Sequence, residues 1–336
     1  MPEIINDRDL PRILSTPTKQ IKFAKKLVAE QLGVTVKRGG VLRAPIQGMF
    51  SRTHFLKLSD GREIAQQFRT EPLDLASFIT ARKVLGCVVP EVIALESEEL
   101  RKEGVWAYSL TRILGQTWLR GVAGKGAEGR VAINKSLGQV FAKGFMAATS
   151  EKAVEEHVRP HLEAILASEQ EEVIAYRPHV QAMADKLDEL KKFPLWIAHY
   201  DLNDVNILID DDCNVTGLVD WELSTPLPFG AGLGRIHTIA GEYHDGEFWM
   251  PDEFEDAERA FWNGLFDGMD INVREMLEKN IDLVQDAVQL GTLLDCFFFL
   301  DGKVGFSPVS LKAFPKFLTY RIPFVRGDEG PYSSEV

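Results

Sequence analysis

The chain has 336 residues, a length that is natural for two compact regions. Apolar residues make up 45% of it, and its formal net charge of −12 argues against nonspecific binding to nucleic acid or to an anionic membrane. The charged first residues lack a signal-peptide core, and no run approaches the ~18 apolar residues of a membrane span, so we expect a cytoplasmic protein.

The first part of the chain predicts a small sheet with one or two helices. Residues 16–32 place apolar side chains at helical spacing, Gly33 follows as a stop, and a second helix is predicted at 74–86. Strand-like segments lie at 41–44, 53–58, 63–68, 88–95 and 106–113. The loop 47–51 between the first two strands contains Gly48, which allows the backbone to approach a ligand closely.

The rest of the chain is predicted to be mostly helical. Helical periodicity runs through 131–149, 152–168, 170–191, 254–266 and 281–299. One strand-like island, residues 196–219, interrupts these helices, and the Gly-, Ser- and acid-rich tail after about residue 326 is expected to fray. We therefore expect an α+β fold with a small N-lobe, residues 1–114, and a larger helical C-lobe, residues 115–336.

The strand-like island carries the strongest chemical signal. His199, Asp201 and Asn206 stand at H-x-D-x4-N spacing, and two short strands joined by a turn follow, the second ending at Asp220. A hairpin of this kind can bring Asn206 and Asp220 to one end, opposite each other. Their amide and carboxylate oxygens are hard ligands of the kind that Mg²⁺ prefers.

The same segment suits phosphoryl transfer, which needs a positioned acceptor and metal ions that neutralise phosphate charge. Asp201 can accept the proton of an acceptor hydroxyl. We expect His199, the other residue assigned to the catalytic loop, to orient that loop by hydrogen bonding rather than to transfer a proton.

These residues resemble the aminoglycoside phosphotransferase and choline kinase-like family of small-molecule kinases. The family pattern H-G-D-x-x-x-x-N-I-L-V-D, followed by a short strand ending in I-D-W/F-E, is matched by residues 199–210 and 218–222. The resemblance implies a two-lobed protein-kinase-like fold, with an antiparallel sheet in the N-lobe and a mostly helical C-lobe. It also implies use of ATP and Mg²⁺, with Asp201 as catalytic base and Asn206 and Asp220 as metal ligands.

The resemblance extends to the expected nucleotide-binding residues. Gly48 to Ser51 stand where the family has its phosphate-covering loop, and residues 88–95 resemble the V-P-x-V strand that follows the N-lobe helix. Thr111 to Ile113 resemble the hinge, whose backbone would meet the adenine.

Two departures from the family pattern concern the phosphates. Gln67 stands where the family has a Lys or Arg on the third strand, and Arg69, on the same strand face, could replace it. In the family, that basic residue pairs with a Glu in the following helix. Here the corresponding residues, 76–85, contain no acid. Loss of a charge-assisted contact with the phosphates would lower the rate of phosphoryl transfer roughly 10²- to 10³-fold.

Three further signals have plainer interpretations. Residues 124–129 match G-x-G-x-x-G but follow no strand of a βαβ unit, so we interpret them as a loop. His157, His161 and His179 show no metal-binding pattern and are expected to be surface or half-buried side chains. The acid-rich stretch 242–258 is either a solvated face or a wall that receives a cationic or aromatic substrate.

Two hypotheses about function remain open. The first is an ATP- and Mg-dependent kinase of a hydroxyl on a small molecule, which could be cationic or aromatic. The second is a kinase-like protein that no longer phosphorylates, either a binding or scaffold module or a repurposed biosynthetic enzyme, and the missing Lys–Glu pair favours it. A hydrolase is disfavoured because the chain has no G-x-S-x-G elbow.

Overall fold

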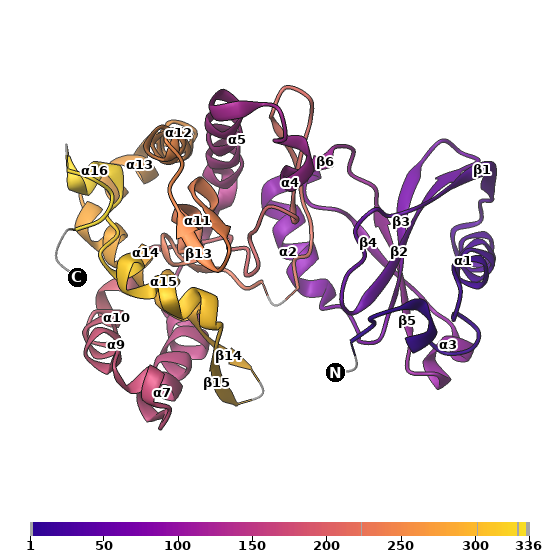
Figure 1. Ribbon diagram of the computed structural model, residues 1–336, viewed down its shortest axis with the longest axis horizontal. Helices are drawn as coiled ribbons and strands as arrows, with labels where there is room; N and C mark the ends of the chain where they lie inside the picture. The colour runs from indigo at the N-terminus through magenta and orange to yellow at the C-terminus, as the bar shows by residue number, and fades with distance from the viewer. Residues whose placement is uncertain (1–2, 223, 301, 328, 334–336) are drawn as a thin grey trace. The chain divides into compact units, whose positions relative to one another are not determined.

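The computed structural model describes residues 3–222, 224–300, 302–327 and 329–333. The chain divides into two compact units, an N-terminal unit of residues 1–114 and a C-terminal unit of residues 115–336 (Figure 1). The N-terminal unit mixes an antiparallel sheet with helices, whereas the C-terminal unit is mostly helical with four short two- and three-stranded sheets.

A five-stranded antiparallel sheet forms the centre of the N-terminal unit. Its strands, in spatial order, are β1 (Val36–Arg43), β2 (Ser51–Leu58), β3 (Glu63–Arg69), β5 (Trp106–Thr111) and β4 (Val92–Leu95). The β2–β3 turn contains Gly61 at φ 97°, a conformation that glycine adopts without strain. This turn fixes the register in which Ser51 lies opposite Arg69 and Thr53 opposite Gln67.

The two longer helices of the N-terminal unit lie where the sequence predicts them, within 16–32 and 74–86. The hydroxyl of Thr16 caps α1 (Pro17–Leu32), and Gly33 ends it at φ 67°. Asp74 caps α2 (Leu75–Leu85) by accepting the Ala76 N–H. Short helical turns complete the unit as η1 (Asp7–Asp9), η2 (Gly86–Val88) and α3 (Glu98–Lys102).

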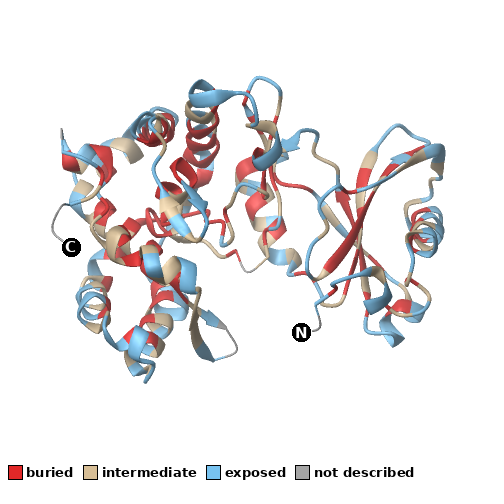
Figure 2. Cartoon of the chain, viewed as in Figure 1, coloured by how far each residue is buried: buried red, intermediate tan, exposed pale blue. Residues whose placement is uncertain are grey.

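The core of the N-terminal unit lies between α1 and one face of the sheet. Apolar side chains of α1, such as Ala24 and Val28, pack with Leu56 of β2 and Phe68 of β3, and all four are fully buried. Figure 2 shows the central strands of this unit largely buried. Ile4, Leu10 and Leu14, which precede α1 in the chain, belong to the same core.

Two strand predictions in the N-terminal unit were wrong in extent. Strand β1 begins at Val36, five residues before the predicted start, because the pairing with β2 shifts register between Val36 and Val41. That irregularity contains Gly39 and Gly40, which conceal the strand in the sequence pattern. Strand β4 begins only at Val92, because residues 86–88 form a 3₁₀ turn.

The C-terminal unit is built from helices with short strands between them. The longer helices are α5 (Gly126–Phe141), α7 (Arg159–Ala167), α9 (Arg177–Ala184), α12 (Phe254–Asp267), α13 (Ile271–Glu278), α14 (Ile281–Cys296) and α15 (Pro308–Leu318). The shorter helical segments are α4 (Trp118–Gly121), η3 (Ala142–Gly144), α6 (Glu151–Ala153), η4 (Val154–Val158), α8 (Glu171–Ile174), α10 (Leu187–Leu190), η5 (Ala231–Leu233), α11 (Ile236–Ala240) and α16 (Pro323–Arg326).

Four small antiparallel sheets connect these helices. Their strands are β6 (Gln116–Thr117), β9 (Ile207–Ile209) and β10 (Val215–Leu218); β7 (Phe145–Thr149), β8 (Pro194–Trp196) and β11 (Leu227–Pro228); the pair β12 (Glu242–His244) and β13 (Glu247–Trp249); and the pair β14 (Phe297–Leu300) and β15 (Lys303–Phe306). The first two of these sheets flank the predicted catalytic loop, since β8 precedes it and β9 follows it.

Glycines allow the two central helices of the C-terminal unit to pack closely. A Cβ atom on Gly138 of α5 would lie 2.1 Å from the Phe261 carbonyl oxygen, and one on Gly264 of α12 would lie 2.5 Å from that of Lys135. Contacts this short are impossible for a real side chain, so larger residues would separate the helices. Trp262 and Phe266 of α12 are fully buried in the core that results.

Four predictions for the C-terminal unit were wrong in detail. Residues 145–149 form a strand that pairs with β8 rather than the end of a helix, and residues 297–299 are likewise a strand. The segment 170–191 is broken into three short helices. The tail does not fray up to Ser333, because Tyr332 is half-buried and forms a β-bridge with Tyr320; residues 328 and 334–336 lie outside the described part.

Among the described residues, no helix has both the length and the apolar character needed to cross a membrane.

Candidate active site

The hairpin of β9 and β10 positions the two predicted metal ligands. Leu218 pairs with Ile207, and the Val219 N–H donates to the Asn206 carbonyl oxygen at 2.9 Å. Asn206 and Asp220 therefore flank the same end of this hairpin. Asp220 has φ 65°, a left-handed conformation that turns the chain at the end of the strand and that Asp tolerates better than most residues.

The loop from β8 to β9 is held by its own side chains. The carbonyl oxygen Oδ1 of Asn203 accepts the N–H groups of Val205 at 3.0 Å and Asn206 at 3.1 Å. This Asx turn reverses the chain immediately after Asp201. The Asn206 side chain then reaches back, and its Nδ2 donates to the Asp201 carbonyl oxygen at 2.9 Å.

Both carboxylate oxygens of Asp201 have defined partners. Asn206 Nδ2 donates to Oδ2 at 3.2 Å, and Arg235 Nη1 donates to Oδ1 at 2.8 Å. The side chain is 47% exposed, so it remains accessible from solvent while its orientation is fixed. A carboxylate held in this way is pre-organised to receive a proton from a bound hydroxyl.

Arg235 links Asp201 to a second carboxylate, Asp295, near the end of α14. Its Nε and Nη2 both lie 2.6 Å from Asp295 Oδ1. Burial raises the pKa of Asp295, and the adjacent guanidinium opposes that shift. Burial alone would lower the pKa of Arg235, but the two carboxylates outweigh it and raise that pKa, so the guanidinium stays charged.

Small residues between β11 and α11 bring Arg235 into this position. A Cβ on Gly234 would lie 2.2 Å from the Gly291 carbonyl carbon, and one on Gly291 would lie 2.1 Å from the Ala231 oxygen. The segment 230–234 therefore packs directly onto α14. This close packing brings Arg235 next to Asp295 of α14.

The surroundings of His199 suit a structural role rather than proton transfer. Its Nε2 donates to the Val219 carbonyl oxygen at 2.8 Å, and its ring packs against Trp221 with centroids 4.6 Å apart. Burial lowers the pKa of His199 to about 4, although the hydrogen bond to Val219 and the charge of Asp201 oppose that shift. The neutral ring thus ties the catalytic loop to the residue before Asp220, which fits the orienting role expected from sequence.

A cavity of about 170 Å³ opens beside the catalytic loop, within the C-terminal unit. His199, Tyr200, Arg235 and Asp295 line it together with several Ala and Gly residues. A cavity of roughly 150 Å³ is large enough for a benzene ring, so the enclosed part of a ligand here has on the order of six non-hydrogen atoms.

The donor set at the hairpin fits a magnesium ion. The Nδ2 group of Asn206 donates to Asp201, which leaves Oδ1 as the atom that Asn206 can offer a cation. Mg²⁺ is usually bound by one or two carboxylates, with waters and substrate phosphates completing its shell. Across the described part of the chain, no group of three or more His, Cys, Asp or Glu side chains forms a separate metal cluster.

In the N-terminal unit, the structure brings Ser51 beside Arg69, because these two residues are register partners in β2 and β3. Gly48 lies next to Ser51, since a Cβ on Gly48 would be 2.7 Å from the Ser51 hydroxyl. Arg69 is buried, and its Nη2 lies 3.4 Å from Glu71 Oε1. Gln67 is half-buried and faces Thr53 across the sheet.

The two expected hinge residues lie away from that group. Thr111 ends β5 and pairs with Ile64, at the opposite end of β3 from Arg69. Ile113 follows in the segment that leads out of the N-terminal unit. With a rise of about 3.3 Å per strand residue, roughly 16 Å of strand separates the two ends.

The sequence patterns missed four residues of the site. Arg235 and Asp295 carry no motif, and only the Gly-rich run before Arg235 signals a close approach. His157 is exposed and His161 is half-buried, as the sequence predicts, but both also line the cavity, which no sequence pattern indicated. Burial lowers the pKa of His161.

The acid-rich stretch 242–258 does not line this cavity. Several of its acids pair elsewhere: Glu242 and Glu253 bind Arg130, and Glu258 forms a fully buried ion pair with Arg326. The interpretation of this stretch as a substrate wall therefore gains no support from the cavity.

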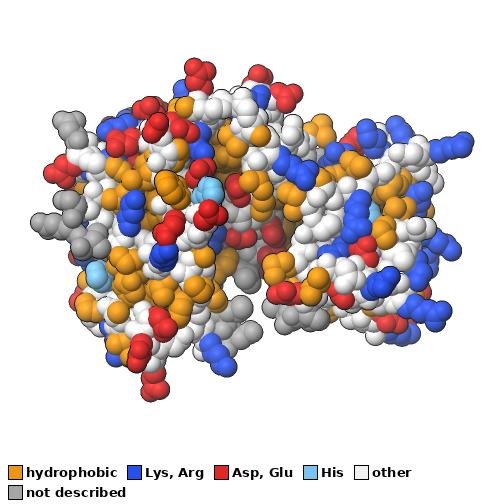
Figure 3. Space-filling model, in the orientation of Figure 1, with side chains coloured by type: hydrophobic (Ala, Val, Ile, Leu, Met, Phe, Trp, Pro, Cys, Tyr) orange, Lys and Arg blue, Asp and Glu red, His pale blue; other side chains and the backbone are white. Residues whose placement is uncertain are grey.

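The two units differ sharply in charge. Residues 1–114 contain 18 Lys and Arg against 13 Asp and Glu, a balance of +5, while residues 115–336 contain 20 against 37, a balance of −17. On the face shown in Figure 3, Lys and Arg side chains gather over the N-terminal unit. The exposed basic residues of this unit include Lys22, Lys25, Lys37, Arg38 and Lys57.

The model of the phosphotransferase enzyme family (APH) matches residues 45–270. The chain belongs to this family. The matched range contains the hairpin, the catalytic loop and Arg235. A search of curated proteins finds no match.

Solved structures of several small-molecule kinases share the fold at low sequence identity. A macrolide 2′-phosphotransferase from Brachybacterium faecium is 18% identical, with a TM-score of 0.50, and the match covers 93% of this chain and 99% of that one. An ethanolamine kinase from Plasmodium vivax is 10% identical, with a TM-score of 0.52 and coverages of 92% and 86%. An amicoumacin kinase, solved with AMP-PNP and Ca²⁺, is 13% identical, with a TM-score of 0.52 and coverages of 89% and 94%. The α+β kinase-like fold class predicted from sequence is thus confirmed.

Proposed function

We propose that this phosphotransferase-family protein is a kinase that transfers the γ-phosphoryl group of ATP, with Mg²⁺, to a hydroxyl of a small molecule. One observation carries the proposal: Arg235 and Asn206 fix the two carboxylate oxygens of Asp201 beside the hairpin end that holds Asp220. A fixed carboxylate next to hard oxygen ligands for a cation is the set of groups that phosphoryl transfer to a hydroxyl requires.

In the proposed reaction, the acceptor hydroxyl oxygen attacks the γ-phosphorus and forms a new O–P bond. The bond between that phosphorus and the β–γ bridging oxygen breaks, and its electron pair leaves with ADP. Asp201 accepts the hydroxyl proton as the new bond forms. Arg235 and Asn206 keep the carboxylate aimed at that proton, and His199 holds the loop by its bond to Val219.

Asn206 and Asp220 would hold the magnesium ion, which when bound neutralises charge on the phosphates. The hydrogen bond from Asn206 to Asp201 also fixes the side chain through which Asn206 would bind the ion. Both ligands thus belong to the same locally ordered segment as the base.

We assign the nucleotide to residues of the N-terminal unit. The Gly48–Ser51 loop would cover the phosphates, and the backbone of Thr111–Ile113 would meet the adenine. Arg69 is the proposed clamp in place of Gln67, and its register partner Ser51 belongs to the phosphate loop. The positive balance of this unit favours a polyanionic ligand such as ATP.

We further propose that the acceptor enters the cavity beside Tyr200 and is a compact, cationic alcohol. Arg235 occupies only Oδ1 of Asp295, which leaves Oδ2 to accept a hydrogen bond from a ligand ammonium group. The small enclosed volume and the −17 balance of the C-terminal unit point in the same direction.

A second candidate function keeps a specific observation in its favour. Helix α2 contains no acid and Gln67 is neutral, so the charged pair that normally grips the phosphates is absent. A kinase-like binding module that does not phosphorylate would have the same features.

Two measurements separate these candidates. Mg-ATP should raise the melting temperature, and ADP should be released in the presence of a compact amino alcohol, with a panel of sugars and aminoglycosides as alternatives. Binding of Mg-ATP without ADP release across the panel would favour the binding module. Absence of any Mg-ATP shift at millimolar concentration would overturn both the nucleotide assignment and the kinase proposal.

A further inference from the structure

The segment before α1 is bound to the loop that we assign to the phosphates. Ile4 uses both of its backbone groups: its N–H donates to the Met49 carbonyl oxygen at 2.6 Å, and its own carbonyl oxygen accepts Arg52 Nη2 at 2.7 Å. The side chain of Ile4 is buried in the core of the N-terminal unit. We call residues 4–9 the N-terminal strap.

Arg52 joins the strap to the loop. It is 3% exposed, and besides its bond to Ile4 its Nη1 donates to the carbonyl oxygens of Gly48 at 3.0 Å and Ser51 at 2.8 Å. Three loop carbonyls, those of Gly48, Met49 and Ser51, are therefore occupied by the strap and Arg52. Carbonyl oxygens repel phosphate, whereas N–H groups bind it. The contacts with the strap and Arg52 therefore keep these three carbonyl oxygens away from a phosphate ligand.

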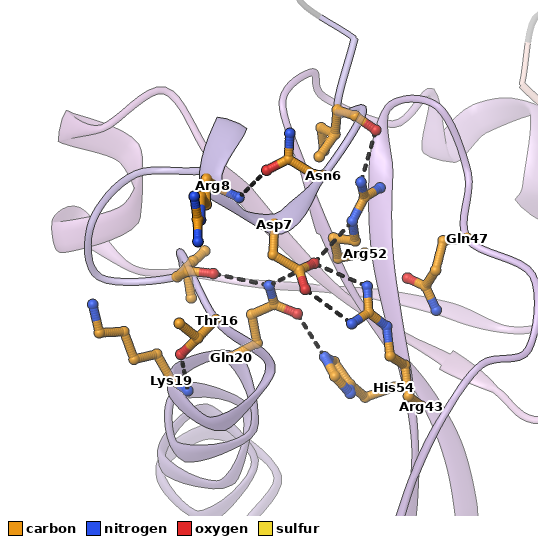
Figure 4. A network of polar contacts seen from close by, with 12 residues as sticks. Asn6, Asp7, Arg8, Thr16, Lys19, Gln20, Arg43, Gln47, Arg52 and His54 are labelled. Carbon is orange, nitrogen blue, oxygen red and sulfur yellow. Dashed lines mark hydrogen bonds and ion pairs between the residues drawn. The ribbon is translucent and has the colours of Figure 1, made fainter.

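Asp7 is the anchor of the strap (Figure 4). Arg43 binds it with two parallel hydrogen bonds of 2.9 Å, and Arg52 Nε donates to it at 3.1 Å. Burial alone would raise the pKa of Asp7, but the hydrogen bonds from Arg43, Gln20 and Arg52 outweigh it and lower that pKa. Paired charges of this geometry are the strong class of hydrogen bond in proteins.

Gln20 and His54 connect the anchor to α1 and β2. Gln20 Nε2 donates to the Leu14 carbonyl oxygen at 2.8 Å and to Asp7 at 3.3 Å, while its Oε1 accepts His54 Nε2 at 2.8 Å (Figure 4). Burial lowers the pKa of His54 to about 4, so the ring is neutral and carries its proton on Nε2. The anchor is thus embedded in a network that spans three elements.

We propose that Asp7 and Arg52 are positioning residues for the phosphate loop: the strap holds residues 48–51 in the conformation that binds ATP. The inference rests on the proposed function for its ligand and on the contacts above for its geometry. Gly48 and Met49 are exposed at the loop tip, so the contacts with the strap restrain a segment that otherwise has little packing. When only a fraction of molecules is binding-competent, the apparent affinity falls by that fraction.

The test compares Asp7→Ala with Asp60→Ala. Asp60 is a matched control because it is also an arginine-paired aspartate of the N-terminal unit, bound to Arg62 in the β2–β3 turn. We expect Asp7→Ala to raise both the dissociation constant and the KM for Mg-ATP about tenfold, with kcat and the KM for the acceptor nearly unchanged. Backbone amides of residues 48–51 should exchange hydrogen faster, while those of β3 and β5 should not.

Two further variants keep the test decisive if Asp7→Ala folds poorly. Arg43→Ala, a substitution of a more exposed partner, should give a weaker effect in the same direction. Arg52→Lys keeps the positive charge but loses the array of hydrogen bonds, so this variant should bind Mg-ATP more weakly than the wild type.

The outcomes distinguish the inference from the function on which it rests. Faster loop exchange together with unchanged Mg-ATP affinity in Asp7→Ala would overturn the positioning role. An equal loss of affinity in Asp60→Ala would overturn it as well, because the effect would then be nonspecific. Failure of the wild-type protein to bind Mg-ATP would overturn the proposed function itself, and the nucleotide role of the strap with it.

Discussion

The two units of the chain differ in how they hold their charged side chains. In the N-terminal unit, where Lys and Arg outnumber acids by five, buried arginines such as Arg52 and Arg69 are paired with acids of their own unit. In the C-terminal unit acids outnumber Lys and Arg by 17, and one arginine, Arg235, is shared between two site carboxylates. In the N-terminal unit, we infer that these pairs order a loop within a positively charged region. In the C-terminal unit, the single arginine between two carboxylates leaves the site with a net negative charge.

This difference suggests a division of labour between the two proposed substrates. A polyphosphate is favoured by the positive unit, and a cationic alcohol by the negative one. Chemistry would require both, with Asp201 and the metal ligands in the C-terminal unit. Substitutions in each unit should therefore affect one substrate and spare the other.

Asp201→Asn should reduce turnover about 10²- to 10⁴-fold, because a carboxamide cannot accept the hydroxyl proton. The affinity for Mg-ATP should change little, since the proposed nucleotide residues lie in the other unit. ADP release under saturating ATP measures the first effect. Asp212→Asn is the matched control, as Asp212 is an exposed aspartate in the turn of the same hairpin; an equal loss there would remove Asp201 from the role of base.

Asp220→Ala should abolish the stabilisation by Mg-ATP. At a ligand concentration of one hundred times the dissociation constant, binding contributes about 2.7 kcal/mol, or roughly 4 °C in melting temperature for a chain of this size. Thermal unfolding with ATP, in the presence and absence of Mg²⁺, measures the effect. Asp211→Ala, in the same hairpin, should keep the shift; retention of the full shift in Asp220→Ala would exclude it as a metal ligand.

The motif residues of the candidate site show how much of it could be predicted from sequence alone. Asp201, Asn206 and Asp220 fall within one loop and one hairpin, so their spacing is fixed locally and their neighbourhood could be predicted. Arg235 and Asp295 are 60 residues apart in sequence, and no local pattern encodes the ion pairs that Arg235 forms with Asp295 and Asp201.

The fold of the N-terminal unit shows the same difference between features set by neighbouring residues and features set by residues far apart in sequence. The two longer helices, α1 and α2, could be located from sequence because helical periodicity and the stop at Gly33 depend on residues close together in the chain. The strap could not be predicted, because Asp7 meets Arg52 across 45 residues of sequence. Strand β7 was mistaken for helix because its pairing with β8 overrides local propensity.

His237→Phe should make the protein less sensitive to acid. Burial lowers the pKa of His237 to about 3, and neither ring nitrogen has a hydrogen-bond partner among the described residues. The unfolded chain binds a proton near the ordinary value of 6.5, so stability is lost as the pH falls from about 6.5 toward 3. Between pH 7.5 and pH 5 this loss is about 2 kcal/mol, which corresponds to roughly 3 °C in melting temperature.

Thermal unfolding of wild type and His237→Phe at the two pH values measures that difference. His54 of the N-terminal unit is the internal comparison, because burial lowers its pKa only to about 4. An acid-induced loss of stability as large in His237→Phe as in the wild type would show that other groups govern it.

Asp295→Asn should raise the KM for a cationic amino alcohol about tenfold, equivalent to ~1.4 kcal/mol, and should leave the KM for a neutral alcohol of similar size nearly unchanged. The reason is that the substitution removes the charge facing the ligand but keeps the shape. Asp286→Asn, on the same helix and paired with Lys186 outside the cavity, is the control. Equal changes for both alcohols would argue against an ammonium group at Asp295.

The most direct test of the central claim follows the phosphoryl group itself by ³¹P NMR, with ATP, Mg²⁺ and the panel of alcohols. The account predicts a new phosphate-monoester resonance, growing as the γ-phosphate resonance of ATP declines, with wild-type protein and with Asp212→Asn but not with Asp201→Asn. If the wild-type protein binds Mg-ATP and yet forms no phosphate monoester with any alcohol, the account is contradicted.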